Sequence, residues 1–209
     1  MNVTVLGGTG WTGRLLVAEL IRRGHDVTAL IRDPERSPDH TRVVVGDSRD
    51  PRSLAEALAG AEAVISALGP ARKQNQLHRE TAAQLVPAMR AAGMRRYIGI
   101  SGAGVNADGD RKRRRDRLIS AGMGLFARSM VADKTVELTL WQDTELDWTL
   151  VRPPRLIDGP PTGDLEHDAH ISTRSTNMRR SDLAVFLVDV LESEHYVRQA
   201  PFAATRMAP

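Results

Sequence analysis

Cysteine is absent from the 209 residues, so the chain forms no disulfide and has no thiol chemistry. Aromatic residues make up only 4% of it, and no apolar run approaches the roughly 20 residues needed to cross a bilayer. An apolar core strand begins where a secretory signal would carry its charged region. These absences predict a cytoplasmic globular protein that does not insert into a membrane.

The charge balance is mildly basic. A formal net charge of +3 suits anionic ligands and does not by itself indicate nucleic acid. The strongest basic run, Asp110–Arg117, has no interleaved aromatic residue, whereas a nucleic-acid groove combines phosphate partners with stacking platforms. We therefore expect this run to form a solvated loop or helix face, and we expect no nucleic-acid partner.

An apolar segment leads directly into a glycine-rich turn near the N-terminus. It reads Val3-Thr4-Val5-Leu6-Gly7-Gly8-Thr9-Gly10-Trp11-Thr12-Gly13. Its glycines satisfy both the dinucleotide-binding fingerprint and a wider Gly-x-x-Gly-x-x-Gly spacing. Glycine permits a tight turn, lets backbone N–H groups approach phosphates, and lets the following helix pack closely on the strand. The segment predicts a pyrophosphate site at a helix N-terminus.

Strand and helix patterns alternate after this turn, which predicts a Rossmann-like, doubly wound parallel α/β sheet. A single domain over 1–209 is expected, with a dinucleotide-binding core over 1–155. Residues 156–209 are expected to supply a substrate-side loop, a final helix and an edge strand, with 156–180 outside any sheet. The final helix begins at Ser181 and Asp182, whose side chains are expected to cap it.

The residues after the second strand select between the two nicotinamide coenzymes. An acidic side chain there accepts hydrogen bonds from a ribose 2′-OH, whereas arginine pairs with a 2′-phosphate. Arg32 lies about 20 residues beyond the glycine turn, and Arg36 adds a second guanidinium, which favours NADP(H). The alternative is that Asp33 binds the 2′-OH of NAD(H) while both arginines are solvated.

Two further strand ends carry candidate contacts. Asp47 is expected either to accept from the adenine amino group or to cap the helix after Pro51. Residues 66–69 are small enough for their backbone to approach the nicotinamide ribose closely. Both positions follow the carboxyl ends of strands, where open parallel sheets bind ligands.

Several segments together resemble the atypical short-chain dehydrogenases/reductases, specifically the NmrA-like NAD(P)-binding group that includes biliverdin-IX-beta/flavin reductase. The resemblance covers nearly the whole chain and rests on the glycine turn, Leu30–Asp33, Val43–Asp47, Ile100–Ala103, Asp147–Pro154, Gly159–Gly163 and Arg180–Ala184. It implies cofactor contacts at Gly7, Thr9, Gly10, Trp11, Thr12, Gly13, Arg32, Arg36, Asp47, Leu68, Gly69 and Pro153. We also expect cofactor contacts at the adjoining residues Ser48, Ala67 and Arg152.

The chain departs from this family at the usual proton donor. Ordinary members pair a tyrosine with a lysine four residues later, and the lysine lowers the pKa of the phenol. Lys134 stands at the lysine position here, but Met130 replaces the tyrosine. Ser101 follows a strand, with Gly102 where relatives often have a second serine. Ser101 and Lys134 are therefore the remaining candidate catalytic residues.

Two functions fit these residues. In the first, hydride passes to a conjugated acceptor such as a flavin, a quinone, a tetrapyrrole or a similar enone. Delocalisation stabilises the product anion, and water, Ser101 or Lys134 supplies the proton. In the second, the protein binds NADP(H) without turnover and reports its level to a partner, as NmrA-like regulators are thought to do.

Two weaker groupings remain. Arg72 and Lys73 follow the fourth strand and either anchor an acidic substrate or lie in an exposed loop. His167 and His170 share a segment with several carboxylates. Their spacing without a rigid element is more typical of exposed polar residues than of metal ligands, so we expect no metal.

Overall fold

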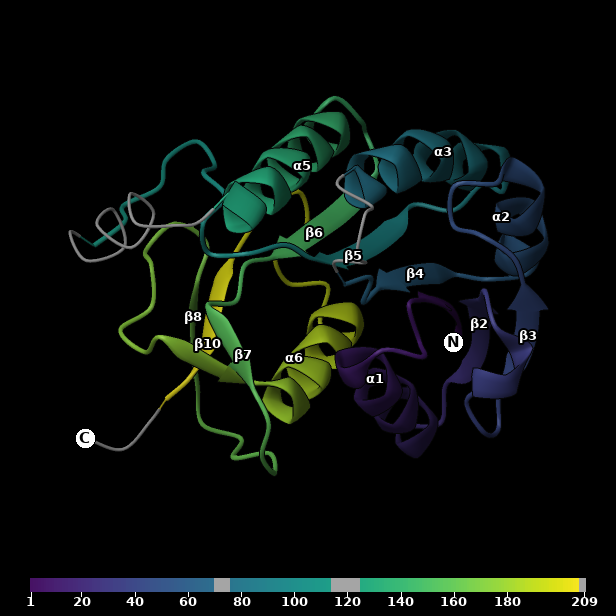
Figure 1. Cartoon of the computed structure of the whole chain (residues 1–209), viewed down its shortest axis with the longest axis horizontal. Coiled ribbons are helices and arrows are strands. Elements are labelled where there is room, and N and C mark those ends of the chain that lie inside the picture. The colour runs from purple at the N-terminus through teal and green to yellow at the C-terminus, as the bar shows by residue number, and fades with distance from the viewer. Residues whose placement is uncertain (70–75, 114–124, 207–209) are drawn as a thin grey trace.

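A central parallel sheet organises the computed structural model, which describes residues 1–69, 76–113 and 125–206 (Figure 1). Its six strands lie in the order β3-β2-β1-β4-β5-β6. This order confirms the Rossmann-like prediction, and it reverses direction between β1 and β4, where open α/β sheets place their ligands. The strands are β1 (Asn2–Leu6), β2 (Asp26–Ile31), β3 (Arg42–Val45), β4 (Ala63–Ser66), β5 (Arg96–Ile100) and β6 (Asp147–Val151).

Helices cover both faces of this sheet, as Figure 1 shows. One face carries α1 (Trp11–Arg22) and α6 (Arg180–Glu192), and the other carries α2 (Pro51–Leu58), α3 (Leu77–Ala91) and α5 (Leu125–Gln142). Each face has its own apolar core, centred on Leu16 and Leu187 in one and on Leu85 and Trp141 in the other. Burying one such apolar side chain stabilises the folded state by about 1.5–3 kcal/mol. No helix in the described ranges is long and apolar enough to cross a membrane.

The start of α2 corrects one prediction. Asp50, not Asp47, caps this helix, because the Asp50 carboxylate accepts a hydrogen bond from the Ser53 backbone N–H at 2.9 Å. Asp47 instead lines a cavity at the ends of the strands.

Residues 156–180 contain strands, so the prediction that they lie outside any sheet is wrong. β7 (Arg155–Ile157) pairs in parallel with β9 (Asn177–Arg179), and β8 (Leu165–Asp168) pairs antiparallel with β10 (Phe202–Thr205). The glycines and prolines that suggested a loop occupy only the connection between β7 and β8. These strands are three or four residues long and pair with distant segments, so no local periodicity marks them.

Asp182 joins these small sheets to α6 and does not cap the helix as predicted. The cap position is Arg179, which makes no side-chain cap hydrogen bond. The buried Asp182 carboxylate instead accepts from the Thr162 N–H at 2.7 Å, the Thr162 hydroxyl at 2.9 Å and the Thr205 hydroxyl at 2.8 Å. The Ser181 hydroxyl donates to the Gly159 carbonyl at 2.7 Å. Both side chains therefore hold the connection between β7 and β8.

The beginning of the basic run is anchored to the protein, contrary to the prediction of a solvated face. Asp110 accepts two hydrogen bonds from the fully buried Arg152 guanidinium, at 2.6 and 2.8 Å. The Lys112 ammonium donates to the Ala103 and Val105 carbonyls at 2.8 and 2.9 Å. Residues 114–117 of the run lie outside the described residues.

We predict that Asp182→Ala lowers the free energy of unfolding by about 2–4 kcal/mol, because it leaves buried donors without their charged acceptor. Urea unfolding measures this change. Asp164→Ala is the control, since Asp164 pairs with Arg206 while both side chains are more than half exposed; its effect should stay within about 0.5 kcal/mol. Equal effects of the two substitutions would contradict the role given to Asp182.

Candidate functional site

The glycine turn brings backbone atoms closer together than side chains would permit. Gly7 has a positive φ of 77°, and a Cβ added there would lie 2.9 Å from the Ala67 carbonyl carbon. A Cβ at Gly13 would lie 2.1 Å from the Gly7 carbonyl oxygen. Gly10 is the N-cap of α1, and its N–H donates to that same oxygen at 3.0 Å. The turn therefore depends on glycine at positions 7 and 13.

The first cavity lies over this turn and has a volume of about 460 Å³. The first turn of α1 contains no acidic residue, so no carboxylate there competes for its free N–H groups. This cradle fits a pyrophosphate. Described lining residues include Gly7, Thr9, Gly10, Trp11, Thr12, Arg32, Arg36, Asp47, Ser48, Ala67, Leu68 and Gly69.

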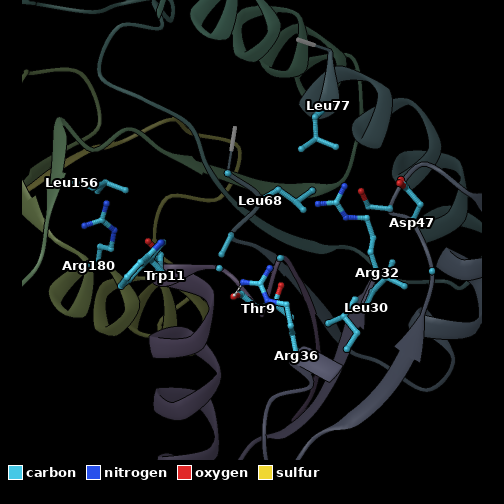
Figure 2. A pocket seen from close by; sticks show the side chains of 18 residues that line it. Thr9, Trp11, Leu30, Arg32, Arg36, Asp47, Leu68, Leu77, Leu156 and Arg180 are labelled. Carbon is cyan, nitrogen blue, oxygen red and sulfur yellow. Dashed lines mark hydrogen bonds between the residues drawn. The ribbon is translucent and has the colours of Figure 1, made fainter. Parts of the chain in front are cut away.

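Two arginines that follow β2 line this cavity, Arg32 directly after the strand and Arg36 in the next turn, as Figure 2 shows. Arg36 also donates to the Thr9 carbonyl at 3.3 Å, which ties it to the glycine turn. The Asp33 carboxylate accepts from the Glu35 N–H at 3.1 Å at the start of a short 3₁₀ helix, Pro34–Arg36. Asp33 is not among the residues that line the cavity. The charged side chains that follow β2 and line the cavity are therefore positive.

Asp47 lines the same cavity as an ionised acceptor. Hydrogen bonds from Arg49 to both carboxylate oxygens, at 2.9 and 2.8 Å, lower the pKa of Asp47 to about 2. The neighbouring Ser48 hydroxyl is hydrogen-bonded to the Thr81 hydroxyl at 2.9 Å.

A second cavity of about 900 Å³ continues from the first. The two share Thr12 in the first turn of α1 and Leu68 after β4, and they share Leu156 and Arg180 on the far side. Figure 2 places Trp11, Leu156 and Arg180 together at this junction. Trp11 is 80% exposed and forms part of the rim. The two cavities form one continuous cleft.

Ser101, Lys134 and Pro153 line the second cavity. The buried Ser101 hydroxyl has no hydrogen-bond partner among the described residues. The Lys134 ammonium donates to the Ile100 carbonyl at 2.6 Å and lies 3.5 Å from His78 Nδ1. Burial lowers the pKa of Lys134, so its proton is easier to release than that of an exposed lysine.

Behind Lys134 lies a buried polar cluster that sequence reasoning missed. Glu137 Oε1 accepts from the Tyr97 hydroxyl at 3.3 Å, and Oε2 lies 3.9 Å from His78 Nδ1. Burial raises the pKa of Glu137 to about 7 and lowers that of His78 to about 2. The sequence did contain one indication of this cluster. Glu137 lies three residues after Lys134, on a face of the helix that also carries the core residues Leu138 and Trp141.

Neither tyrosine of the chain lines the cleft. Tyr97 is buried against Glu137, and the Tyr196 hydroxyl is hydrogen-bonded to His167. The geometry therefore provides no phenol as a proton donor beside Lys134, where Met130 also lines the cavity.

Arg152 corrects the predicted set of cofactor contacts. It lines neither cavity, because its guanidinium is bound by Asp110, donates to the Ala200 carbonyl at 2.6 Å, and stacks 3.8 Å from the Phe202 ring centre.

Gly13 lies beneath the turn and acts through packing. The other predicted residues all line the cleft, and Arg72 and Lys73 lie outside the described residues.

His167 lies on β8 with its ring 5.0 Å from that of Phe186. Within the described ranges, no group of three or more His, Cys, Asp or Glu side chains is placed to hold a metal ion.

We predict that Glu137→Gln becomes more stable relative to the wild type as the pH rises from about 5 to about 8. The folded state raises the pKa of Glu137 from 4.5 to about 7. It therefore holds an extra proton in this window, and the contribution of Glu137 to stability falls as the pH rises. Glutamine has no such charge, so the difference in the free energy of unfolding should grow by roughly 1–3 kcal/mol.

Urea unfolding across this pH range measures the difference. His78 acts in the opposite direction, since its lowered pKa removes stability as the pH falls below 6.5, and both proteins contain it. The control is Glu145→Gln, because Glu145 is 86% exposed beside Arg198. A difference for Glu137→Gln that is independent of pH would contradict the buried state of this carboxyl.

Comparison with known proteins identifies the family. A family profile described as NAD(P)H-binding matches residues 7–194. The 3-diazoavenalumate denitrifying reductase of a Streptomyces species is 40% identical over 114 residues, which cover 48% of this chain and 38% of that protein. The matches span less than half the length of this and two other curated relatives.

Solved structures match along nearly the whole chain. A candidate exported protein of Burkholderia pseudomallei is 31% identical with a TM-score of 0.83, and the match covers 98% of this chain and 99% of that one. A candidate NADH-flavin reductase of Streptococcus pneumoniae shares the fold at 24% identity, with a TM-score of 0.83 and coverage of 99% and 100%. The chain thus belongs to the NAD(P)H-binding family, which confirms the resemblance that its sequence predicted.

Proposed function

We propose that this protein is an NADPH-dependent reductase that transfers hydride to a conjugated small-molecule acceptor in the second cavity. The observation that carries the proposal is the continuous cleft. One part presents the glycine turn and two arginines, and the other part presents the buried Lys134 and the unpartnered Ser101 hydroxyl.

The preference for NADPH rests on the charges beside β2. Arg32 and Arg36 line the first cavity, where a guanidinium pairs with a 2′-phosphate. The Asp33 carboxylate, which would favour NADH, is used in the local turn. When bound, the coenzyme supplies the hydride. The backbone N–H groups of the turn and of α1 would hold its phosphates, and the backbone of 67–69 would contact its nicotinamide half.

Lys134 and Ser101 are the proposed catalytic residues. An acceptor that has gained a hydride carries an added negative charge and needs one proton. The Lys134 ammonium releases a proton to the acceptor as its N–H bond breaks, and it regains a proton from water. The Ser101 hydroxyl donates a hydrogen bond to the developing anion. Delocalisation over a conjugated system lowers the demand on this donor, which suits a cleft that lacks the tyrosine.

The names of relatives agree with such an acceptor. The Streptomyces relative is named for the reduction of a diazo compound, and the Streptococcus structure for a flavin. We assign the core over 1–155 to the coenzyme and 156–209 to the acceptor side, with the wall of the second cavity beginning at Arg155, where β7 starts. A chain without cysteine is compatible with a reducing compartment, and we propose the cytoplasm.

Stopped-flow oxidation of NADPH tests this function with a flavin, a quinone and a tetrapyrrole as acceptors. We expect hydride loss with at least one of them and slower loss in Lys134→Met. Tight NADPH binding without oxidation by any acceptor would favour a sensor of NADP(H) and overturn the reductase.

We predict that Arg32→Ala weakens NADPH binding by about 10- to 100-fold, because a charge-assisted hydrogen bond contributes about 1.5–3 kcal/mol. NADH binding should stay nearly unchanged, since it lacks the 2′-phosphate. Isothermal titration calorimetry measures both dissociation constants. Asp33→Ser keeps a side chain that can cap the turn, and as the control it should not weaken NADH binding. Tighter binding of NADH than NADPH by the wild type would contradict the assignment.

A further inference from the structure

The second cavity is lined by positive side chains. Lys134 lines it from α5, Arg155 from β7 and Arg180 from the first turn of α6. No aspartate or glutamate is among the described residues that line it. Lys134 lies beside Ile100, where β5 ends, whereas the two arginines belong to the substrate-side wall. Lys134, the proposed proton donor, and the two arginines therefore lie on different walls of the cavity.

The two arginines of that wall differ in their partners. Arg180 donates to the Asp158 carboxylate at 2.8 Å, so its charge is partly balanced. Arg155 forms no ion pair with any described residue, and its side chain is exposed to the cavity. A guanidinium in this state is available to a ligand, and its planar fork matches a carboxylate or a phosphate.

Asn177 adds a neutral donor next to Arg155. These two residues are register partners in the parallel pairing of β7 with β9, so their side chains leave the same face of that small sheet. The Arg155 N–H donates to the Thr176 carbonyl at 3.2 Å, which fixes the two strands at this point. Both residues are among those that line the second cavity.

We propose that the hydride acceptor carries an anionic group, a carboxylate or a phosphate, and that Arg155 together with Asn177 binds this group. The inference rests on the proposed function, because it names the class of acceptor for the same cleft. The conjugated part of the acceptor lies toward Ser101 and Lys134, and its anionic substituent lies against β7 and β9. Acceptors without a charged substituent are then weak ligands.

Matched pairs of probes test the anionic group directly by binding. FMN and riboflavin differ by a phosphate, and biliverdin and its dimethyl ester differ by two carboxylates. Each probe is titrated into the protein saturated with NADP⁺, which occupies the coenzyme cavity and has no hydride to transfer. Quenching of flavin fluorescence and the absorbance change of the tetrapyrrole report binding without turnover.

We expect at least one anionic probe to bind about tenfold or more tightly than its neutral partner. Arg155→Ala should remove this difference by weakening only the anionic probe, and Asn177→Ala should reduce it. Arg206→Ala makes the same change of charge at an exposed residue that lines neither cavity, and it should have no effect.

Three results would overturn the inference while leaving the coenzyme site intact. These are equal binding within both pairs, equal weakening of both partners by Arg155→Ala, and no binding of any probe to the NADP⁺ complex. Failure of NADP⁺ to bind, seen by calorimetry before any probe is added, would instead overturn the proposed function and this inference with it.

Discussion

The close approach of α1 to the glycine turn is the constraint on which the cleft depends. With only hydrogen at position 13, the helix can begin against the Gly7 carbonyl, and with positive φ at position 7 the turn can pass beside the end of β4. These two contacts aim the N-terminus of α1 at the space between β1 and β4. The Arg36 bond to the Thr9 carbonyl then joins the segment after β2 to the glycine turn. A substitution that moves the turn therefore also moves the acceptor of this hydrogen bond.

The far side of the cleft is supported by different interactions. Asp182 gathers hydrogen bonds from the connection after β7 and from β10, while the buried pair of Arg152 and Asp110 fixes the segment that follows β5. Removing either partner of a buried ion pair leaves the other charge without compensation, which typically costs about 3–5 kcal/mol. Both devices are charged groups with fixed hydrogen-bond geometry, so they position the wall of the cleft as well as stabilise it.

The sequence predicted the sheet and the coenzyme turn because both have local patterns. The glycine spacing and the strand–helix alternation need no knowledge of distant residues, and Arg32 could be placed by counting from the turn. Arg152 could not be placed correctly, because an arginine after a strand has the same pattern whether it meets a ligand or a buried carboxylate. Its partner Asp110 lies 42 residues away. Asp182 looked like a cap for the same reason, since its actual partners are Thr162 and Thr205. The cluster around Glu137 depends on burial between α3, α5 and β5, which only the assembled fold provides.

The pairing of β7 with β9 has a consequence for how this protein can change. These strands are hydrogen-bonded to each other and not to the six-stranded sheet, so exchanging their residues does not shift the register of the strands below the coenzyme. Under the proposed function, residues 155 and 177 are open to mutation and selection without a change in the strands of the six-stranded sheet. New acceptors would then arise by drift in two three-residue strands, and a library randomised there is a practical starting point for engineering.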